Sequence, residues 1–142
     1  MNTASPHILV VDDDPALREL MSAYLTENEF QVTAVASGAE MNAILQDSVI
    51  DLVVLDLRLG GEDGMQLARG LRDTSELPVI IVTGKQDEAD RLMGLEIAAD
   101  DYVTKPFSNR EMLARIRAVL RRYQARTDVA SPGRSSKRRA YR

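Results

Sequence analysis

Short runs of consecutive apolar residues alternate along the chain with longer stretches in which apolar residues recur at helical spacing. The runs lie at residues 7–11, 30–35, 50–55, 78–83 and 101–104. The first and third runs are almost uninterrupted Val, Ile and Leu, which is typical of strands buried on both faces of a parallel sheet. The pattern therefore predicts five parallel strands separated by helices.

The stretches between the runs carry the signals of amphipathic helices. One stripe follows the spacing i, i+3, i+4, i+7, i+8 and consists of Leu17, Leu20, Met21, Tyr24 and Leu25. Asp14 followed by Pro15 predicts an N-cap with proline at the first helical position. Ser37 and Ser108 each stand three residues before a glutamate, which is the capping-box pattern. The last helix is expected to end at about residues 122–126.

Alternating strands and helices with short connections predict an α/β fold, a flavodoxin-like (βα)5 doubly wound sandwich around a parallel five-stranded sheet. The expected strand order is 2-1-3-4-5. The expected organisation is an N-terminal tail over 1–6, one globular domain over 7–125 and a basic linker or tail over 126–142. The tail is rich in Ser, Pro, Gly and Arg and has no apolar periodicity.

Composition excludes several classes of protein. The 142 residues are 44% hydrophobic and 28% charged, include no cysteine and one histidine, His7, so disulfide scaffolds, thiolate metal sites and multi-histidine zinc sites are excluded. No apolar run approaches the roughly 20 residues of a membrane span, and no secretory signal is recognisable. We therefore expect a cytoplasmic protein without a membrane partner.

Charge is unevenly distributed between the body and the tail. The net charge is −4, but residues 126–142 carry six basic residues and one acid, a net charge of +5, which leaves −9 on the body. An acidic body repels phosphates and is a poor nucleic-acid binder. The basic segment predicts a linker to another module, and the alternative is a basic nucleic-acid arm in its own right.

Polar residues cluster at the predicted carboxyl ends of the strands, where ligand sites form in such sheets. They are Asp12 and Asp13 after the first strand, Asp56 at the third, Thr83 at the fourth and Lys105 after the fifth. Crowded carboxylates require a cation, and oxygen ligands suit Mg²⁺. A carboxylate can also act as a nucleophile and form an acyl phosphate, and Asp56 is the best candidate. Each residue alone has an ordinary structural interpretation, as a turn, N-cap or solvated residue, but the joint pattern favours a site.

Four motifs carry a family resemblance. VVDDDPALRELM, LVVLDLRLGGEDG, PVIIVTG and ADDYVTKPF, in this order, resemble the receiver domain of two-component response regulators over residues 7–124. The resemblance implies that Asp56 accepts a phosphoryl group from the phosphohistidine of a sensor histidine kinase. It implies a regulatory phosphoacceptor rather than an enzyme, with Mg²⁺-dependent self-phosphorylation and slow autodephosphorylation only.

The same resemblance assigns the remaining roles. Mg²⁺ is held directly by Asp13, through water by Asp12, and by Asp56 and the backbone carbonyl of Arg58. Thr83 and Tyr102 are the switch pair, and both are expected to point away from Asp56 before phosphorylation. Lys105 pairs with the phosphate, and the peptide bond between Lys105 and Pro106 is expected to be cis. One departure is Gly60, which stands where the family usually has proline and which we expect to loosen the loop beside Asp56.

Residues 87–122 resemble the OmpR/PhoB subfamily of winged-helix transcription factors. The resemblance implies a homodimer on activation, through the fourth helix, fifth strand and fifth helix. Acids and bases occupy complementary positions, as a symmetric interface requires. The expected pairs are Arg91 with Glu111, Glu96 with Arg117, Asp101 with Arg115, and Asp100 with Arg122. The alternative is a helix face with mixed solvated charges.

The sequence leaves three candidate functions to distinguish. The first is a phosphorylation-activated regulator of transcription that would reach DNA only through a missing C-terminal winged-helix domain. The second is a stand-alone receiver that acts in a phosphorelay or as a protein-interaction module. The third is a Mg²⁺-dependent phosphatase with an aspartyl phosphate, which would need an acid at Arg58 and is therefore disfavoured. An ATP-using kinase is disfavoured because the chain has no G-x-x-x-x-G-K-[ST] motif.

Overall fold

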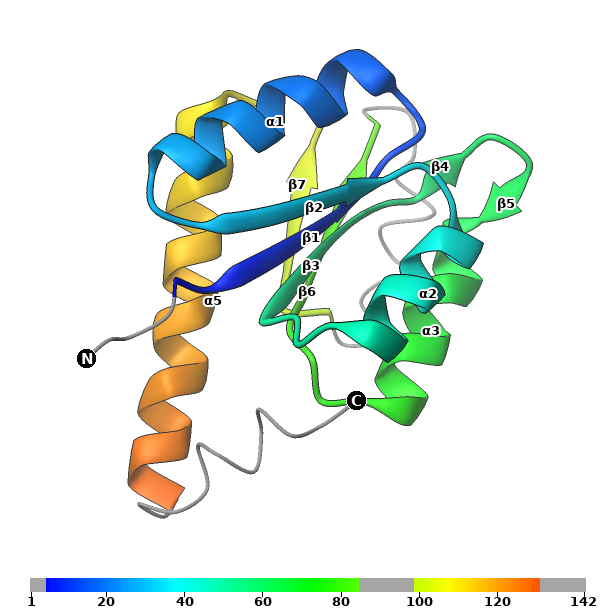
Figure 1. Ribbon diagram of the computed structural model, residues 1–142. Coiled ribbons are helices and arrows are strands. Elements are labelled where there is room, and N and C mark those ends of the chain that lie inside the picture. The colour runs from blue at the N-terminus through cyan, green and yellow to red at the C-terminus, as the bar shows by residue number, and fades with distance from the viewer. Residues whose placement is uncertain (1–4, 85–98, 131–142) are drawn as a thin grey trace.

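The computed structural model of the chain describes residues 5–84 and 99–130, with the side chains of residues 126–130 outside this description. A parallel sheet lies between two layers of helices (Figure 1). Its strands are β1 (His7–Val11), β2 (Gln31–Val35), β3 (Leu52–Asp56), β6 (Val79–Thr83) and β7 (Asp101–Thr104). The helices are α1 (Pro15–Glu27), α2 (Gly38–Asp47), α3 (Gly64–Thr74) and α5 (Asn109–Ala130).

The strand order is β2-β1-β3-β6-β7, which confirms the predicted order 2-1-3-4-5. All neighbouring strands of this sheet are parallel. Helices α1 and α5 cover one face, and α2 and α3 cover the other (Figure 1). The flavodoxin-like α/β class expected from the sequence is therefore present.

Alternation along the strands divides the core into two clusters, because successive side chains of a strand point to opposite faces. In β1, Ile8 and Val10 pack on the side of α1 and α5, together with Ile116 and Val119. Leu9 and Val11 belong to the other cluster. Burial on both faces explains why the central strands appear in the sequence as continuous apolar runs.

The predicted helix starts are confirmed. The Asp14 side chain accepts a hydrogen bond from the Ala16 N–H at 3.0 Å, and Pro15 is the first residue of α1. The Ser37 and Ser108 hydroxyls accept from the N–H groups of Glu40 and Glu111 at 3.2 and 3.0 Å. Each cap satisfies a donor that the first helical turn leaves unpaired.

Helix α5 extends beyond its predicted end at residues 122–126 and continues to Ala130. Residues 126–130 therefore belong to the helix rather than to the linker that we expected there. No Pro or Gly lies within α5, so nothing in its sequence interrupts the helix before Ala130. The helix expected between β6 and β7 falls on residues 85–98, which lie outside the described residues. In the part of the chain that the structure describes, no helix is both long and apolar enough to cross a membrane.

A small antiparallel ribbon, which the sequence analysis did not predict, follows β3. It consists of β4 (Arg58–Leu59) and β5 (Glu62–Asp63), with Gly60 and Gly61 at the turn. Gly60 has φ +63°, a conformation that proline cannot adopt because its ring fixes φ near −65°. Glycine at this position therefore gives the loop a defined hairpin turn rather than only loosening it.

Gly64 lies where α3 begins against the backbone of the loop. A Cβ atom there would lie 2.5 Å from the Leu57 Cα, and the backbone cannot move aside. Gly70, in the middle of the same helix, has nothing within 4 Å of a Cβ position. The two glycines thus have opposite packing constraints.

We predict opposite effects of alanine at these two positions. Gly64→Ala should lower the free energy of unfolding by about 1–3 kcal/mol through steric overlap. Gly70→Ala should raise it by up to about 1 kcal/mol, because alanine is the better helix former. Urea unfolding followed by circular dichroism measures both, and equal losses in the two variants would contradict this account.

Candidate functional site

The carboxyl ends of four neighbouring strands bring the predicted polar residues to one edge of the sheet. Asp12 follows β1, Asp56 ends β3, Thr83 ends β6 and Lys105 follows β7. Backbone hydrogen bonds continue the strand pairing into this edge. The Asp12 N–H donates to the Val35 carbonyl at 3.0 Å, and the Lys105 N–H donates to the Thr83 carbonyl at 2.7 Å. The sheet itself therefore fixes where these side chains begin.

Lys105 bridges the two buried carboxylates. Its Nζ lies 2.6 Å from Oδ2 of Asp56 and 3.4 Å from Oδ2 of Asp12. Asp12 and Asp56 are 2% and 3% exposed, whereas about a third of the Lys105 side chain reaches solvent. One ammonium group thus partly neutralises two carboxylates that water barely reaches.

Burial and mutual repulsion change the proton affinity of this cluster. The pKa of Asp12 is raised from its ordinary 3.8 to about 6. Burial is the main cause, and the Asp56 carboxylate adds to it, whereas the Asp14 N–H and the charge of Lys105 oppose it. Burial alone would lower the pKa of Lys105, but its interactions with Asp56 and Asp12 outweigh burial and raise it. The ammonium therefore stays charged, and the two carboxylates compete for it.

Backbone groups orient the carboxylates. The Arg58 N–H donates to Oδ1 of Asp56 at 2.9 Å, and the Asp14 N–H donates to Oδ1 of Asp12 at 2.9 Å. The guanidinium of Arg18, which the sequence analysis did not single out, donates to the Asp12 carbonyl at 2.8 Å. The sequence signal for this contact was the position of Arg18 in the first turn of α1, four residues after Asp14 and close to the Asp12 backbone. These contacts hold Oδ1 of each carboxylate, and Oδ2 of each carboxylate faces Lys105 Nζ.

The two predicted switch residues are both buried at their polar ends. Thr83 is 0% exposed, and its hydroxyl has no hydrogen-bond partner among the described residues. A buried hydroxyl without a partner is costly, so Thr83 has hydrogen-bonding capacity that a ligand could use. The Tyr102 ring packs against the core beneath α2 and α3, and its hydroxyl oxygen is buried. The expectation that both side chains point away from Asp56 before phosphorylation stays a prediction.

The remaining predicted site residues border this cluster. Asp13 is exposed, and its Oδ2 lies 3.5 Å from the position that a Cβ of Gly60 would take. Arg58 is exposed in β4. The Lys105–Pro106 peptide bond is cis, as the resemblance implies. Acidic, hydroxyl and ammonium groups therefore meet at one edge, an arrangement suited to an oxyanion held next to a cation.

Comparison with known proteins identifies the family. Residues 8–117 match the response regulator receiver domain. The chain belongs to the response regulator receiver family. Over 116 residues it is 48% identical to the regulatory protein VirG of Agrobacterium fabrum. The matched region covers 81% of this chain and 46% of VirG. It is 43% identical over 138 residues to the transcriptional regulatory protein AruR of Pseudomonas aeruginosa, covering 94% of this chain and 57% of AruR.

Solved receiver structures agree with the fold. The receiver domain of the TMAO respiratory system response regulator TorR is 42% identical, with a TM-score of 0.79 over 82% of this chain and 98% of that one. VirG, AruR and TorR support the OmpR/PhoB-like subfamily expected from the sequence. The chain spans about half the length of the curated relatives that it matches.

The receiver's predicted dimer-face residues are already paired in part within one chain. Nη1 of Arg115 lies 3.0 Å from Oδ2 of Asp101, and its Nε lies 3.2 Å from Oε2 of Glu111. Asp101 is thus placed as expected on the surface but has an intramolecular partner. Arg117 is exposed on α5, and the predicted residues Arg91 and Glu96 lie outside the described residues.

Asp100 is directed into the receiver rather than toward a second copy. Its Oδ2 accepts from Nη2 of Arg72 at 2.9 Å and from the Val79 N–H at 2.8 Å, and its Oδ1 accepts from the Tyr123 hydroxyl at 2.8 Å. Arg122 donates to the Asp100 carbonyl instead of its carboxylate. The structure therefore ties α3, β6 and α5 together at a residue that we expected to reach across an interface.

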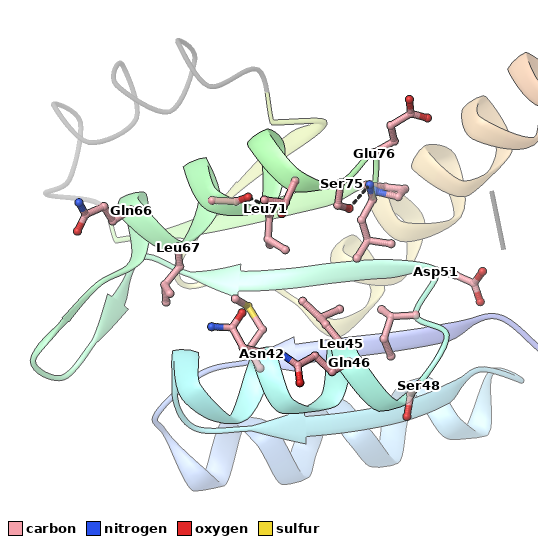
Figure 2. Close-up of a pocket in the computed structure, with 16 residues that line it drawn as sticks. Asn42, Leu45, Gln46, Ser48, Asp51, Gln66, Leu67, Leu71, Ser75 and Glu76 are labelled. Carbon is pink, nitrogen blue, oxygen red and sulfur yellow. Dashed lines mark hydrogen bonds between the residues drawn. The ribbon is translucent and has the colours of Figure 1, made fainter. Parts of the chain in front are cut away.

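A groove lies between α2 and α3, at the opposite edge of the sheet (Figure 2). Its volume is about 490 Å³, and its apolar lining includes Met41, Leu45 and Leu71. It is bordered by residues that precede β3 and β6, whereas the acidic cluster follows these strands. None of the predicted site residues lines it.

We predict that protonation of Asp12 makes the free energy of unfolding depend on pH. The folded chain keeps a proton on Asp12 up to pH of about 6, whereas the unfolded chain releases it near 3.8, so this residue's contribution to stability falls as pH rises through this window. The difference in free energy of unfolding between wild type and Asp12→Asn should change by about 2–3 kcal/mol, in favour of the variant, between pH 4 and 7. Urea unfolding at several pH values without divalent cations measures it. A difference that does not vary with pH would refute the raised pKa.

Proposed function

We propose that this receiver accepts a phosphoryl group on Asp56 from the phosphohistidine of a sensor histidine kinase in the cytoplasm, and that this event switches an output. The observation that carries the proposal is the buried Asp56 carboxylate, 2.6 Å from Lys105 Nζ and next to a second buried carboxylate, Asp12. A nucleophile held beside a fixed ammonium group can receive an anion that the acidic body would otherwise repel.

The transfer is a displacement at phosphorus. A carboxylate oxygen of Asp56 forms the new P–O bond while the P–N bond of the phosphohistidine breaks, and the electron pair of that bond returns to the imidazole nitrogen. The product is an aspartyl phosphate. Water can later attack its phosphorus, which returns Asp56 as a carboxylate and releases inorganic phosphate. The chain would thus turn over slowly as a regulatory phosphoacceptor.

Lys105 and Thr83 supply the groups that an incoming phosphoryl would need. The ammonium of Lys105 can move from the carboxylate to a phosphoryl oxygen without leaving the site, since it already reaches both Asp56 and Asp12. The Thr83 hydroxyl can donate to a second phosphoryl oxygen and thereby gain the hydrogen bond that it lacks. We propose that this gain draws Thr83 toward the phosphoryl group and shifts the packing around Tyr102.

The donor set fits Mg²⁺. The proposed ligands are all oxygens, from Asp13, Asp56 and the Arg58 carbonyl, and we propose that Asp12 binds through water. Among the described residues no three His, Cys, Asp or Glu side chains form a closed metal cage, but Mg²⁺ keeps several waters and needs only one or two carboxylates. When bound, the ion would neutralise the crowded carboxylates and the arriving phosphoryl oxygens. Burial, together with repulsion from Asp56, raises the pKa of Asp12, and a bound cation would relieve both effects.

We propose transcription as the output, through a C-terminal winged-helix DNA-binding domain. AruR, of which this chain covers 57%, is named a transcriptional regulatory protein. A stand-alone receiver in a phosphorelay is the second candidate. A phosphatase gains no support, because the position two residues after Asp56 is occupied by Arg58, a cation that cannot act as a general acid at neutral pH.

Activation would favour a symmetric homodimer through β7 and α5 together with the segment between β6 and β7. Glu111, Arg115, Arg117 and Arg122 lie on α5, and Asp101 begins β7. The Asp101–Arg115–Glu111 cluster is partly exposed and could exchange or share its partners with a second copy. Asp100 contributes indirectly, because its carboxylate holds α3, β6 and α5 in place.

We predict that incubation with phosphoramidate and Mg²⁺ adds one phosphoryl group, measured as a gain of about 80 Da by intact-protein mass spectrometry. Asp56→Asn should abolish the gain, because an amide is not a nucleophile for this transfer. Asp51→Asn is the matched control. Asp51 is as buried as Asp56, but it directly precedes β3 and therefore lies at the opposite edge of the sheet. Full phosphorylation of Asp56→Asn would overturn the assignment.

We predict that beryllofluoride and Mg²⁺ shift the chain from monomer toward dimer at tens of micromolar, as measured by analytical ultracentrifugation. Arg115→Glu should weaken the dimer about tenfold, because a symmetric interface repeats each pair and each exposed pair contributes about 0–1 kcal/mol before repulsion is added. Adding Asp101→Arg should restore part of the loss.

Arg121→Glu makes the same charge change at an exposed position of α5 outside the predicted face and serves as the control. It should leave the dimer unchanged. An activated chain that stays monomeric would refute this face and favour the stand-alone relay.

A further inference from the structure

The ribbon of β4 and β5 carries a group that the proposed chemistry requires. β4 begins two residues after Asp56, and the Arg58 carbonyl is a proposed Mg²⁺ ligand. At the turn, Gly60 lies beside Asp13. In the ribbon, Arg58 pairs with Asp63 and Leu59 pairs with Glu62. Two strands of two residues each are too short to be stable alone, so contacts outside the ribbon must hold it.

Two adjacent acidic residues hold β5 from opposite sides, because successive side chains of a strand point to opposite faces. Asp63 is the N-cap of α3, and its Oδ1 accepts from the Met65 N–H at 3.0 Å. Glu62 reaches the other helix of this layer, where its Oε1 accepts from the Gly38 N–H at 2.9 Å. The ribbon is thus tied to α3 and α2 at once.

The contact with Gly38 is specific in shape. A Cβ atom on Gly38 would lie 3.0 Å from Oε2 of Glu62 and 2.7 Å from Cδ2 of Leu67, so a larger residue there would require both side chains to shift. Gly38 is the first residue of α2, where backbone N–H groups lack partners within the helix and a negative charge is favourable.

Helix α2 does not depend on Glu62 for its cap. Ser37 accepts from the Glu40 N–H, and Oε1 of Glu40 accepts from the Ala36 N–H at 2.7 Å. Two glutamates therefore serve the same helix start. Glu40 acts within its own segment, and Glu62 alone of the two comes from the loop that follows the Asp56 strand.

We infer that Glu62 is a positioning residue for the phosphoryl site: by holding the ribbon against α2 it fixes the Arg58 carbonyl and the Gly60 turn for Mg²⁺. The inference rests on the proposed function. Glu62 would act neither by touching the phosphoryl group nor by capping its own helix, because its carboxylate accepts a hydrogen bond from an amide of another segment.

The test compares Glu62→Ala with Glu40→Ala, which removes a carboxylate from the same helix start but leaves the ribbon tied. Partners that orient a metal ligand typically contribute 10–100-fold to metal affinity, and for this exposed tie we expect about a tenfold weaker Mg²⁺ affinity in Glu62→Ala. Glu40→Ala should bind Mg²⁺ as wild type does. Glu62→Gln should recover most of the affinity, because an amide oxygen can still accept from Gly38. Isothermal titration with MgCl₂ gives the affinities.

A second readout does not use the metal. In hydrogen exchange without Mg²⁺, Glu62→Ala should speed exchange of the Gly38 amide and of the ribbon amides, whereas Glu40→Ala should speed exchange at Ala36 and leave the ribbon unchanged. Equal Mg²⁺ affinity in Glu62→Ala and wild type, or equal losses in both alanine variants, would overturn the inference. Phosphorylation of wild type and its loss in Asp56→Asn report on the proposed function separately, whichever result Glu62 gives.

Discussion

Lys105 stands between two buried carboxylates that would repel each other at the edge of the sheet. Its ammonium nitrogen is 2.6 Å from Asp56 and 3.4 Å from Asp12, and it supplies one positive charge against two negative charges. Burial and, to a smaller extent, the neighbouring charge of Asp56 raise the pKa of Asp12. A cluster that is one charge short of neutral favours a further cation, and a cation in turn makes an incoming phosphoryl group tolerable. The proposed magnesium and phosphoryl chemistry both depend on this constraint.

The surrounding fold fixes the positions of Asp12, Asp56 and Lys105. Asp56 and Asp12 follow strands that are buried on both faces, and Lys105 is fixed to β6 by its backbone hydrogen bond to Thr83. Burial also excludes water from the hydroxyl of Thr83, so this group has no described partner to lose when a phosphoryl oxygen arrives. The same network can therefore be stable at rest and still respond to a ligand.

Much of the fold and of the site could be predicted from the sequence because these features have short-range signals. Continuous Val, Ile and Leu marked the buried strands, caps at Asp14, Ser37 and Ser108 marked helix starts, and polar residues at strand ends marked the edge. The β4–β5 ribbon was not predicted: its Gly60–Gly61 pair is a hairpin signal, but its strands are only two residues long and carry no alternating apolar run.

Other features depend on contacts between residues far apart in the sequence, which no local pattern predicts. The inward direction of Asp100 arises from Arg72 and Tyr123, which come from α3 and α5. Charge complementarity alone could equally place this carboxylate on an interface, and it did so in the prediction. The tie from Glu62 to Gly38 spans 24 positions and joins β5 to the start of α2. The continuation of α5 to Ala130 follows from the absence of a breaker rather than from a signal.

The central claim is that Asp56, Lys105 and Thr83 form one phosphoryl-binding unit. A crystal structure with beryllofluoride and Mg²⁺ tests it most directly. The account predicts beryllium bonded to an Asp56 carboxylate oxygen, with fluorine atoms within hydrogen-bond distance, about 2.6–3.2 Å, of both Lys105 Nζ and Thr83 Oγ1. Beryllofluoride bound to another carboxylate, or bound to Asp56 with the Thr83 hydroxyl still unpaired, would contradict it.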